Sequence, residues 1–241
     1  MKQNNDGAMP ITSHLLELRK RLVVIFLTVL VLSFISFLLS EDLIKNLMSL
    51  SKGYKFIYNT PEALIIQSLK LAIISGIVLS SPVIFFNIWM FVSPALKVTE
   101  RVVITIIFTL GVVLFLVGCV FAYYIIIPFV LKFFVESNSI SELQAYVTLE
   151  GYISIIVSFF IAFGLVFELP VVLLCLDIAG IARRKTFVNM RKFAIVIICI
   201  VSGIITPPDV FSLVVTAIPM VILFELSLFI MYLYEKIMKK N

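Results

Sequence analysis

Long apolar runs constrain this chain more than any other feature. Six can be drawn, over residues 22–39, 64–94, 102–131, 151–176, 193–206 and 213–234. Only 14% of the 241 residues are charged, whereas soluble domains carry about 25%. Because a bilayer core offers no water to backbone groups, a spanning segment must be a helix or part of a closed barrel. Runs of this length predict an all-α integral membrane protein, with six transmembrane helices in one domain covering residues 1–241.

The first and fifth runs raise separate questions. The first follows basic residues and so imitates a signal peptide, but it exceeds the usual ~7–15 apolar residues and no small-residue cleavage site precedes Glu41. We therefore expect a retained span. The fifth run has about 14 residues and would form a helix of only ~21 Å, against a hydrocarbon core of ~30 Å. We expect either a thinned bilayer there or shielding by neighbouring helices.

Prolines and basic residues predict the shape and orientation of the bundle. Prolines lie in or at the ends of spans two, three, four and six, which predicts bent helices and a curved, cup-like wall. Fourteen of the 19 Lys and Arg residues fall in the segments on one side of the predicted spans, and four fall on the other side. By the positive-inside rule, both termini are expected in the cytoplasm (N-in, C-in).

The residue inventory argues against metal, disulfide and protease chemistry. The three cysteines, Cys119, Cys175 and Cys199, are scattered through apolar runs without CxxC spacing, so neither a zinc site nor a disulfide is expected. The single histidine, His14, lies outside the predicted membrane segments, and no pair of aspartates lies within them. An intramembrane protease therefore lacks its catalytic residues, and we expect no enzyme activity, cofactor or metal.

The segment SHLLELRKRL, residues 13–22, forms an amphipathic collar before the first span. At 100° per residue Leu15, Leu18 and Leu22 share one face, while Glu17, Lys20 and Arg21 share another. One interpretation is structural: Glu17 pairs with Arg21 four residues later, and the basic residues contact anionic lipid headgroups. On that reading the collar only anchors the chain at the cytoplasmic surface.

The alternative interpretation concerns the scarcity of acids on the cytoplasmic side. Glu17 precedes the first span, and Glu100 lies in the short turn SPALKVTER between spans two and three. If these segments are adjacent, two carboxylates form a site for paired guanidinium groups, which bind carboxylates bidentately where lysine cannot. Local pairing of Glu100 with Arg101 or Lys97 is the structural alternative.

Two acids inside spans and one in an outer turn are further candidates. A charged group in hydrocarbon costs about 2.5–3.5 kcal/mol on insertion scales, so Glu168 and Glu225 should face protein or water and are functional candidates. Protonation or hydrogen bonding within the bundle is the structural alternative for both. Asp209, in TPPDVFS, is expected to cap the start of the sixth span, a structural role that leaves a functional one open.

Taken in order, eight segments resemble the TatC family, the multi-span receptor of the twin-arginine protein translocase. They are HLLELRKRL (14–22), NTPEAL with Lys70 (59–70), SSPVIFFNIWMFVSPAL (80–96), ER (100–101), FAYY with Pro128, AFGLVFELP (162–170), TPPDVFS (206–212) and AIPMVILFELS (217–227). Each segment alone is modest evidence. Their common order and spacing extend the resemblance over nearly the whole chain.

The resemblance implies protein transport by twin-arginine translocation. It implies a receptor and core subunit that binds twin-arginine signal peptides of folded proteins at the cytoplasmic face and uses the proton-motive force. The family's signal-binding glutamates match Glu17 and Glu100, with Arg19 and Arg101 beside them, and its buried concave-face acid matches Glu168.

The resemblance also implies partners, and the start of the chain indicates a location. The implied partners are TatA-like and TatB-like single-span proteins near the short fifth and sixth spans, membrane lipid, and further copies of the chain within a hetero-complex. No nucleic acid is implied. The polar lead of 12 residues, with Asp6 and without Arg/Ser-rich transit character, indicates a bacterial inner membrane, with an organellar membrane as the second possibility.

A second function class is a small proton-coupled solute transporter that uses Glu168 and Glu225 as relays. Membrane acids are few in this sequence, and the two matched halves typical of secondary transporters are not visible. Solute uptake by the purified protein without partner subunits would favour this class.

Overall fold

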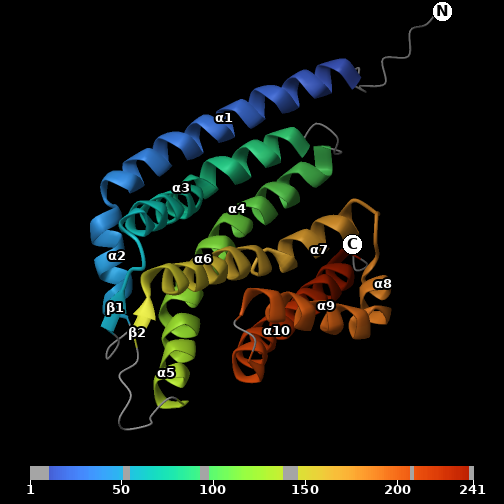
Figure 1. Ribbon diagram of the computed structural model, residues 1–241. Helices are drawn as coiled ribbons and strands as arrows, with labels where there is room; N and C mark the ends of the chain where they lie inside the picture. Colours follow the sequence, from blue (N-terminus) through green and yellow to red (C-terminus); the bar gives the residue numbers. More distant parts are fainter. Residues whose placement is uncertain (1–10, 51–54, 93–97, 138–145, 207–208, 239–241) are drawn as a thin grey trace, which may run out of the picture.

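A computed structural model describes residues 11–50, 55–92, 98–137, 146–206 and 209–238. Most of these residues form helices, joined by short turns and accompanied by one small sheet (Figure 1). The elements in chain order are α1 (Ile11–Leu38), α2 (Ser40–Ser49), β1 (Lys55–Ile57), α3 (Pro61–Val92), α4 (Val98–Phe121), the π-helical turn η2 (Ala122–Ile126), α5 (Ile127–Ser137), β2 (Tyr146–Thr148), α6 (Leu149–Val166), α7 (Leu169–Ile178), α8 (Arg184–Asn189), α9 (Arg191–Ile205) and α10 (Val210–Met238).

Five of the expected spans coincide with helical segments long and apolar enough to cross a membrane. These segments are Leu15–Leu38, Pro61–Phe91, Thr105–Phe133, Leu149–Ile178 and Val210–Lys236. The expected fifth span coincides with α9, which has 15 residues and is therefore only ~22 Å long. Its shortness agrees with the sequence analysis. The sixth span is not short, because α10 has 29 residues, so the prediction of two short spans holds only for the fifth.

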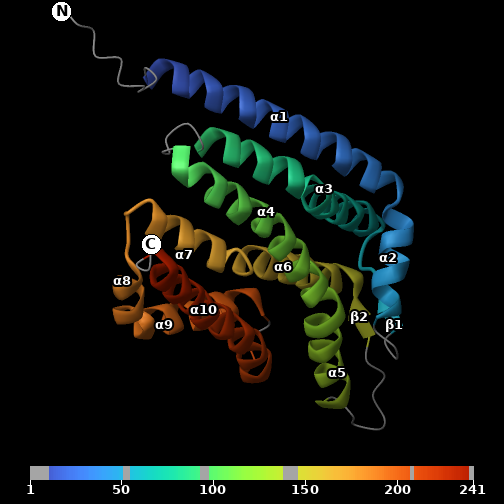
Figure 2. The same cartoon turned by 180° about the vertical axis from the view of Figure 1, so that it is seen from behind.

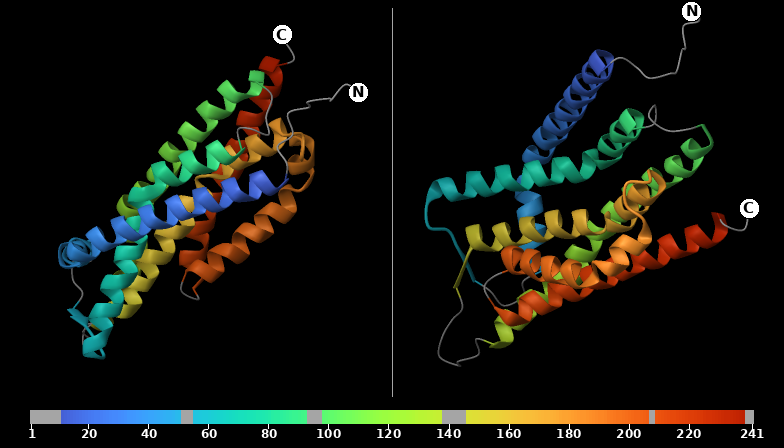
Figure 3. Two further views of the ribbon diagram at one scale, coloured as in Figure 1. Left: turned by 90° about the horizontal axis from the view of Figure 1, so that it is seen from above. Right: turned by 90° about the vertical axis from the view of Figure 1, so that its right-hand side faces the viewer.

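The helices form an open row rather than a closed bundle. α1 packs along α3, and α3 packs on α4 and α6. α7 packs on α10, which also packs on α9 (Figures 1 and 2). At one end of the molecule, here called the termini end, α1 and α4 begin, α3 and α10 finish and α8 lies (Figure 3). At the opposite end, the cap end, lie α2, β1 and β2.

Small side chains allow the close packing of α1 on α3. Ala72, Gly76 and Ser80 recur every four residues along α3, which places them on one face of the helix. A Cβ atom built on Gly76 would lie 2.7 Å from the backbone nitrogen of Ser33 in α1. Such small-residue contacts let two membrane helices approach closely where lipid gives no hydrophobic driving force between them.

Prolines bend the third and fourth spans. Pro128 lies two residues after the π-helical turn Ala122–Ile126, and it has no backbone N–H to donate to that turn. The fourth span breaks at Phe167 and Glu168, just before Pro170 in the first turn of α7. This break sets Glu168 at a joint rather than inside a continuous helix. The remaining prolines of the expected spans are Pro82 inside α3, Pro219 inside α10, and Pro94 outside the described residues.

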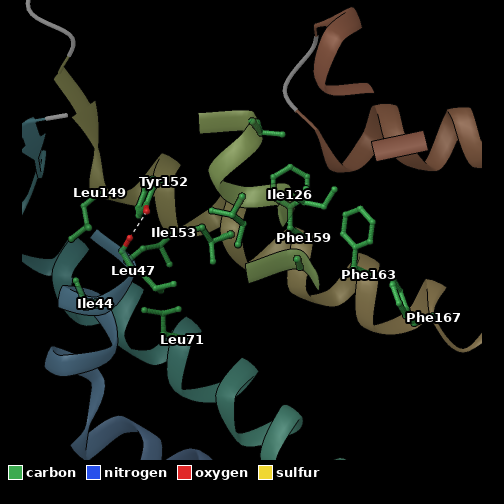
Figure 4. Close-up of a cluster of buried hydrophobic side chains, with 14 of the residues drawn as sticks. Ile44, Leu47, Leu71, Ile126, Leu149, Tyr152, Ile153, Phe159, Phe163 and Phe167 are labelled. Atoms are coloured by element: carbon green, nitrogen blue, oxygen red, sulfur yellow. Dashed lines mark hydrogen bonds between the residues drawn. The ribbon is translucent and has the colours of Figure 1, made fainter. Parts of the chain in front are cut away.

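The cap end is held by a hydrophobic cluster and a two-stranded parallel sheet. β1 pairs with β2 in the register Lys55–Tyr146, Phe56–Val147 and Ile57–Thr148. Tyr152 on α6 is 2% exposed, and its hydroxyl donates a hydrogen bond to the Leu47 carbonyl of α2 (Figure 4). The cluster continues along α6 through buried aromatic side chains, including Phe159 and Phe163. α2 and the sheet were not predicted from the sequence.

Candidate functional site

Glu17 lies near the beginning of α1, at the termini end. Its carboxylate accepts a hydrogen bond from the Arg21 guanidinium, as the structural interpretation of the collar predicted. The Glu17 side chain is 25% exposed and the Arg21 side chain is 14% exposed, so the ion pair is largely withdrawn from solvent. Arg19, two residues after Glu17, is exposed. Glu17 is therefore already engaged by an internal cation.

A groove of about 590 Å³ lies beside this ion pair, between α1 and the last turns of α3. Its lining residues are Leu16, Glu17, Lys20, Arg21, Val24, Asn87 and Met90. The lining combines a carboxylate and two cations with apolar side chains. Asn87 was not singled out in the sequence analysis, because nothing local shows that α3 will turn this amide toward α1. It is 8% exposed, and its Nδ2 donates to the Val83 carbonyl over 2.9 Å.

Glu100 and Arg101 belong to the first turn of α4 by their backbone conformation. Their side chains lie outside the described part of the chain, so their contacts are not stated. α4 begins at the termini end, as α1 does, and the end of α3 lies between them (Figures 1 and 3). The fold therefore brings the helix carrying Glu17 and the helix carrying Glu100 to the same end of the molecule.

Glu168 lines a second, almost wholly apolar groove. The groove holds about 640 Å³ between α3, α4 and α7, with Ile84, Phe108 and Val172 among its lining residues. Glu168 is 7% exposed, and its Oε1 is buried without a hydrogen-bond partner among the described residues. Gly111 on α4 makes room for the carboxyl group: a Cβ atom there would lie 3.1 Å from Glu168 Oε2.

A carboxyl oxygen without a partner in an apolar groove is costly, because it loses its hydration and gains no hydrogen bond in return. The groove therefore offers hydrophobic surface with two polar side chains, Glu168 and Ser81, in its wall. It suits an apolar segment, and the Glu168 carboxyl group could receive a donor from that segment. The sequence identified Glu168 from its place in a span, and the break before Pro170 accounts for its position.

Glu225 on α10 is paired rather than isolated. Its Oε2 accepts a hydrogen bond from Nη2 of Arg191, the first residue of α9, over 2.9 Å. Both side chains are nearly half exposed, at 43% and 47%. The hydrogen-bonded alternative from the sequence analysis therefore describes Glu225, although its partner could not be named. Glu225 does not line the groove that contains Glu168.

Two further polar contacts hold α8 and the turn before α10. Arg184 of α8 pairs with Glu235 near the end of α10 over 3.1 Å, and its guanidinium carbon lies 5.0 Å from the centre of the Tyr232 ring. At the other end of α10, Asp209 accepts a hydrogen bond from the Ser212 amide over 2.7 Å. Asp209 thus caps α10, as the structural interpretation predicted.

The described residues contain no cluster of three or more His, Cys, Asp or Glu side chains that could hold a metal ion. The chemistry available is that of acceptors and cations at the termini end, next to long apolar surfaces. Such a site can bind a ligand that has a cationic group followed by an apolar segment.

Comparison with known proteins agrees with this architecture. The family described as Sec-independent protein translocase protein (TatC) matches residues 13–219. The Sec-independent protein translocase protein TatC of Magnetococcus marinus is 34% identical over 234 residues, covering 95% of this chain and 86% of the relative. TatCy of Bacillus subtilis is 32% identical, covering 95% of this chain and 91% of the relative.

A solved structure gives the same result for the fold. The crystal structure of a twin-arginine translocase receptor, TatC, superposes with a TM-score of 0.82 at 32% sequence identity, covering 91% of this chain and 98% of that chain. The chain therefore belongs to the TatC family and is a multi-pass membrane protein, a non-enzymatic subunit of the Tat protein translocase.

Proposed function

We propose that this subunit is the receptor for twin-arginine signal peptides, with Glu17 and Glu100 as the acceptors for the two guanidinium groups. The observation that carries the proposal is a largely buried carboxylate, Glu17, in a 590 Å³ groove at the end of the molecule where α4 also begins. Guanidinium groups bind carboxylates through paired, charge-assisted hydrogen bonds, which favours arginine over lysine. Arg19 and Arg101 accompany the two acids and shape the local charge.

The termini end is the cytoplasmic face in this proposal. The described cations of α1, α8, α9 and the end of α10 support that orientation through the positive-inside rule. The chain would then span a bacterial inner membrane six times, with α9 as the fifth span. Cysteine labelling with a membrane-impermeant reagent at Lys185 and at Lys45, on opposite ends, tests the orientation.

The apolar portion of the signal peptide lies in the groove that contains Glu168. That groove is bounded by α3, α4 and α7 and has the apolar lining that such a segment needs. Single-span partners of the TatA and TatB type dock along α9 and α10, beside the short fifth span, and several copies of the chain assemble with them. The transporter alternative is not favoured, because Glu225 is paired with Arg191 and lies outside the Glu168 groove.

The test is photo-cross-linking of a twin-arginine signal peptide to the full chain in inverted membrane vesicles that contain the partner subunits. Glu17→Gln and Glu100→Gln should each abolish cross-linking while the protein remains inserted. Glu41→Gln, the same change on α2 at the cap end, is the matched control and should cross-link as the parent does. Parental cross-linking by both site variants would refute the assignment.

A second probe in the apolar part of the peptide tests the groove. Cross-links should form to Val172 or Ile84, which line the Glu168 groove, and not to Leu27 on the exposed face of α1. The reverse pattern would show that the apolar part leaves the groove for lipid.

A further inference from the structure

The Arg21–Glu17 contact raises a question about the proposed receptor site. A carboxylate that is to accept an incoming guanidinium already holds one from its own helix, four residues away. The signal peptide must therefore displace Arg21 or share the carboxylate with it. This inference rests on the proposed function, because it concerns the same carboxylate.

We infer that Arg21 is an internal ligand of the signal-peptide site: in the unoccupied receptor its guanidinium takes the place of a peptide arginine in the groove between α1 and α3. Both Arg21 and Glu17 line that groove, so the internal pair occupies the space an incoming side chain needs. The apolar residues Leu16, Val24 and Met90 of the same groove can cover the aliphatic part of an arginine.

The internal pair is incomplete, which makes it displaceable. Arg21 donates to Glu17 through Nη2, but its Nε is buried without a hydrogen-bond partner among the described residues. An arginine fork is strongest when two nitrogens face the two carboxylate oxygens. A peptide guanidinium that approaches from the groove can make both bonds, and the released Arg21 regains hydration for Nε.

The internal Arg21–Glu17 pair is expected to reduce the receptor's affinity for every signal peptide by the same factor. Only the fraction of receptors whose Glu17 is free can bind, so the apparent dissociation constant rises by the inverse of that fraction. A partly buried pair of this kind lowers affinity by about twofold to fivefold, equivalent to about 0.4–1 kcal/mol. Because the free receptor bears this cost, twin-arginine and twin-lysine peptides are weakened by the same factor, and their affinity ratio is unchanged.

The experiment measures dissociation constants of a twin-arginine and a twin-lysine signal peptide in inverted vesicles that hold the complete translocase. Arg21→Gln should tighten both by about twofold to fivefold at an unchanged ratio. Lys20→Gln is the matched control, because Lys20 lines the same groove and loses the same charge without touching Glu17 in the ion pair. Its smaller effect should vanish as salt rises, since exposed charges are screened within ~8–10 Å.

Arg21→Lys covers the case in which Arg21→Gln fails to insert. It keeps the positive charge needed for orientation but loses the planar fork, so it should also bind both peptides more tightly than the parent. Weaker or unchanged peptide binding by these variants would overturn the inference, and so would a changed arginine-to-lysine ratio, which would place Arg21 in contact with the peptide.

Glu17→Gln distinguishes failure of the Arg21 inference from failure of the proposed receptor site. If it abolishes binding while the Arg21 variants bind no tighter than the parent, the receptor site stands and the internal ligand does not. If Glu17→Gln binds as the parent does, the receptor site itself is wrong.

Discussion

Gly76 is the position where a single methyl group should separate the first two spans. A Cβ atom there would lie 2.7 Å from the backbone nitrogen of Ser33 and 2.8 Å from its Cα atom. Ordinary contacts begin near 3.4 Å, so the backbone of α1 must move away by about 0.7 Å. Backbone cannot rotate aside as a flexible side chain can. Overpacking of this kind costs about 1–3 kcal/mol, so Gly76→Ala should lower the unfolding free energy by that amount.

The control for this variant is Gly203→Ala on α9. A Cβ atom there meets the Leu213 Cδ1 at 3.4 Å, which is an ordinary contact at the flexible end of a side chain. It should therefore leave stability nearly unchanged, or raise it slightly through helix propensity.

Unfolding can be followed in detergent micelles by titration with sodium dodecyl sulfate. The single tryptophan, Trp89, lies on α3 and so reports on the helix against which α1 packs. Gly76→Ala should unfold at a lower denaturant fraction than both the parent and Gly203→Ala. Equal stability of the two variants would refute the claim that the absence of a side chain at Gly76 sets the α1–α3 separation.

Three further predictions follow from the contacts. Reversing one charge of the Arg191–Glu225 pair should weaken assembly with single-span partners, measured by co-purification, and reversing both charges should restore it. If the double reversal does not restore assembly, the two residues act independently of their ion pair. Tyr152→Phe removes one of the two described donors to the buried Leu47 carbonyl, which keeps the Leu50 amide, and should cost about 0.5–1.5 kcal/mol in the same detergent titration, with unchanged stability as the contrary result. Signal-peptide binding should weaken as ionic strength rises, and salt-independent binding would argue against docking on carboxylates.

Local chemistry was predictable from the sequence. The Glu17–Arg21 pair depends only on a four-residue spacing within one helix, and the cap at Asp209 depends on its place before a helix. The long apolar runs fixed five spans, because length and composition alone decide whether a segment can cross a bilayer. Pro170 likewise predicted a bend in the fourth span, and the helix breaks just before it, at Phe167 and Glu168.

Contacts between distant segments were not predictable. Arg191 reaches Glu225 over 34 positions, and the choice of partner depends on how α9 crosses α10 rather than on any local pattern. The β1–β2 pairing joins residues 55–57 to 146–148, and three-residue strands leave almost no periodic signal. Asn87 lines the groove beside Glu17 because α3 packs along α1, which no local pattern in the sequence indicates.

In the proposed receptor, Glu17 and Glu100 meet at one membrane face within reach of one peptide. Pulsed electron spin resonance on the full chain in lipid nanodiscs tests this most directly, with labels at Glu17→Cys and Glu100→Cys after replacement of Cys119, Cys175 and Cys199. We expect a distance below roughly 20 Å, which six extended residues can bridge. A distance near the ~30 Å thickness of the hydrocarbon core would place the carboxylates on opposite faces and contradict it.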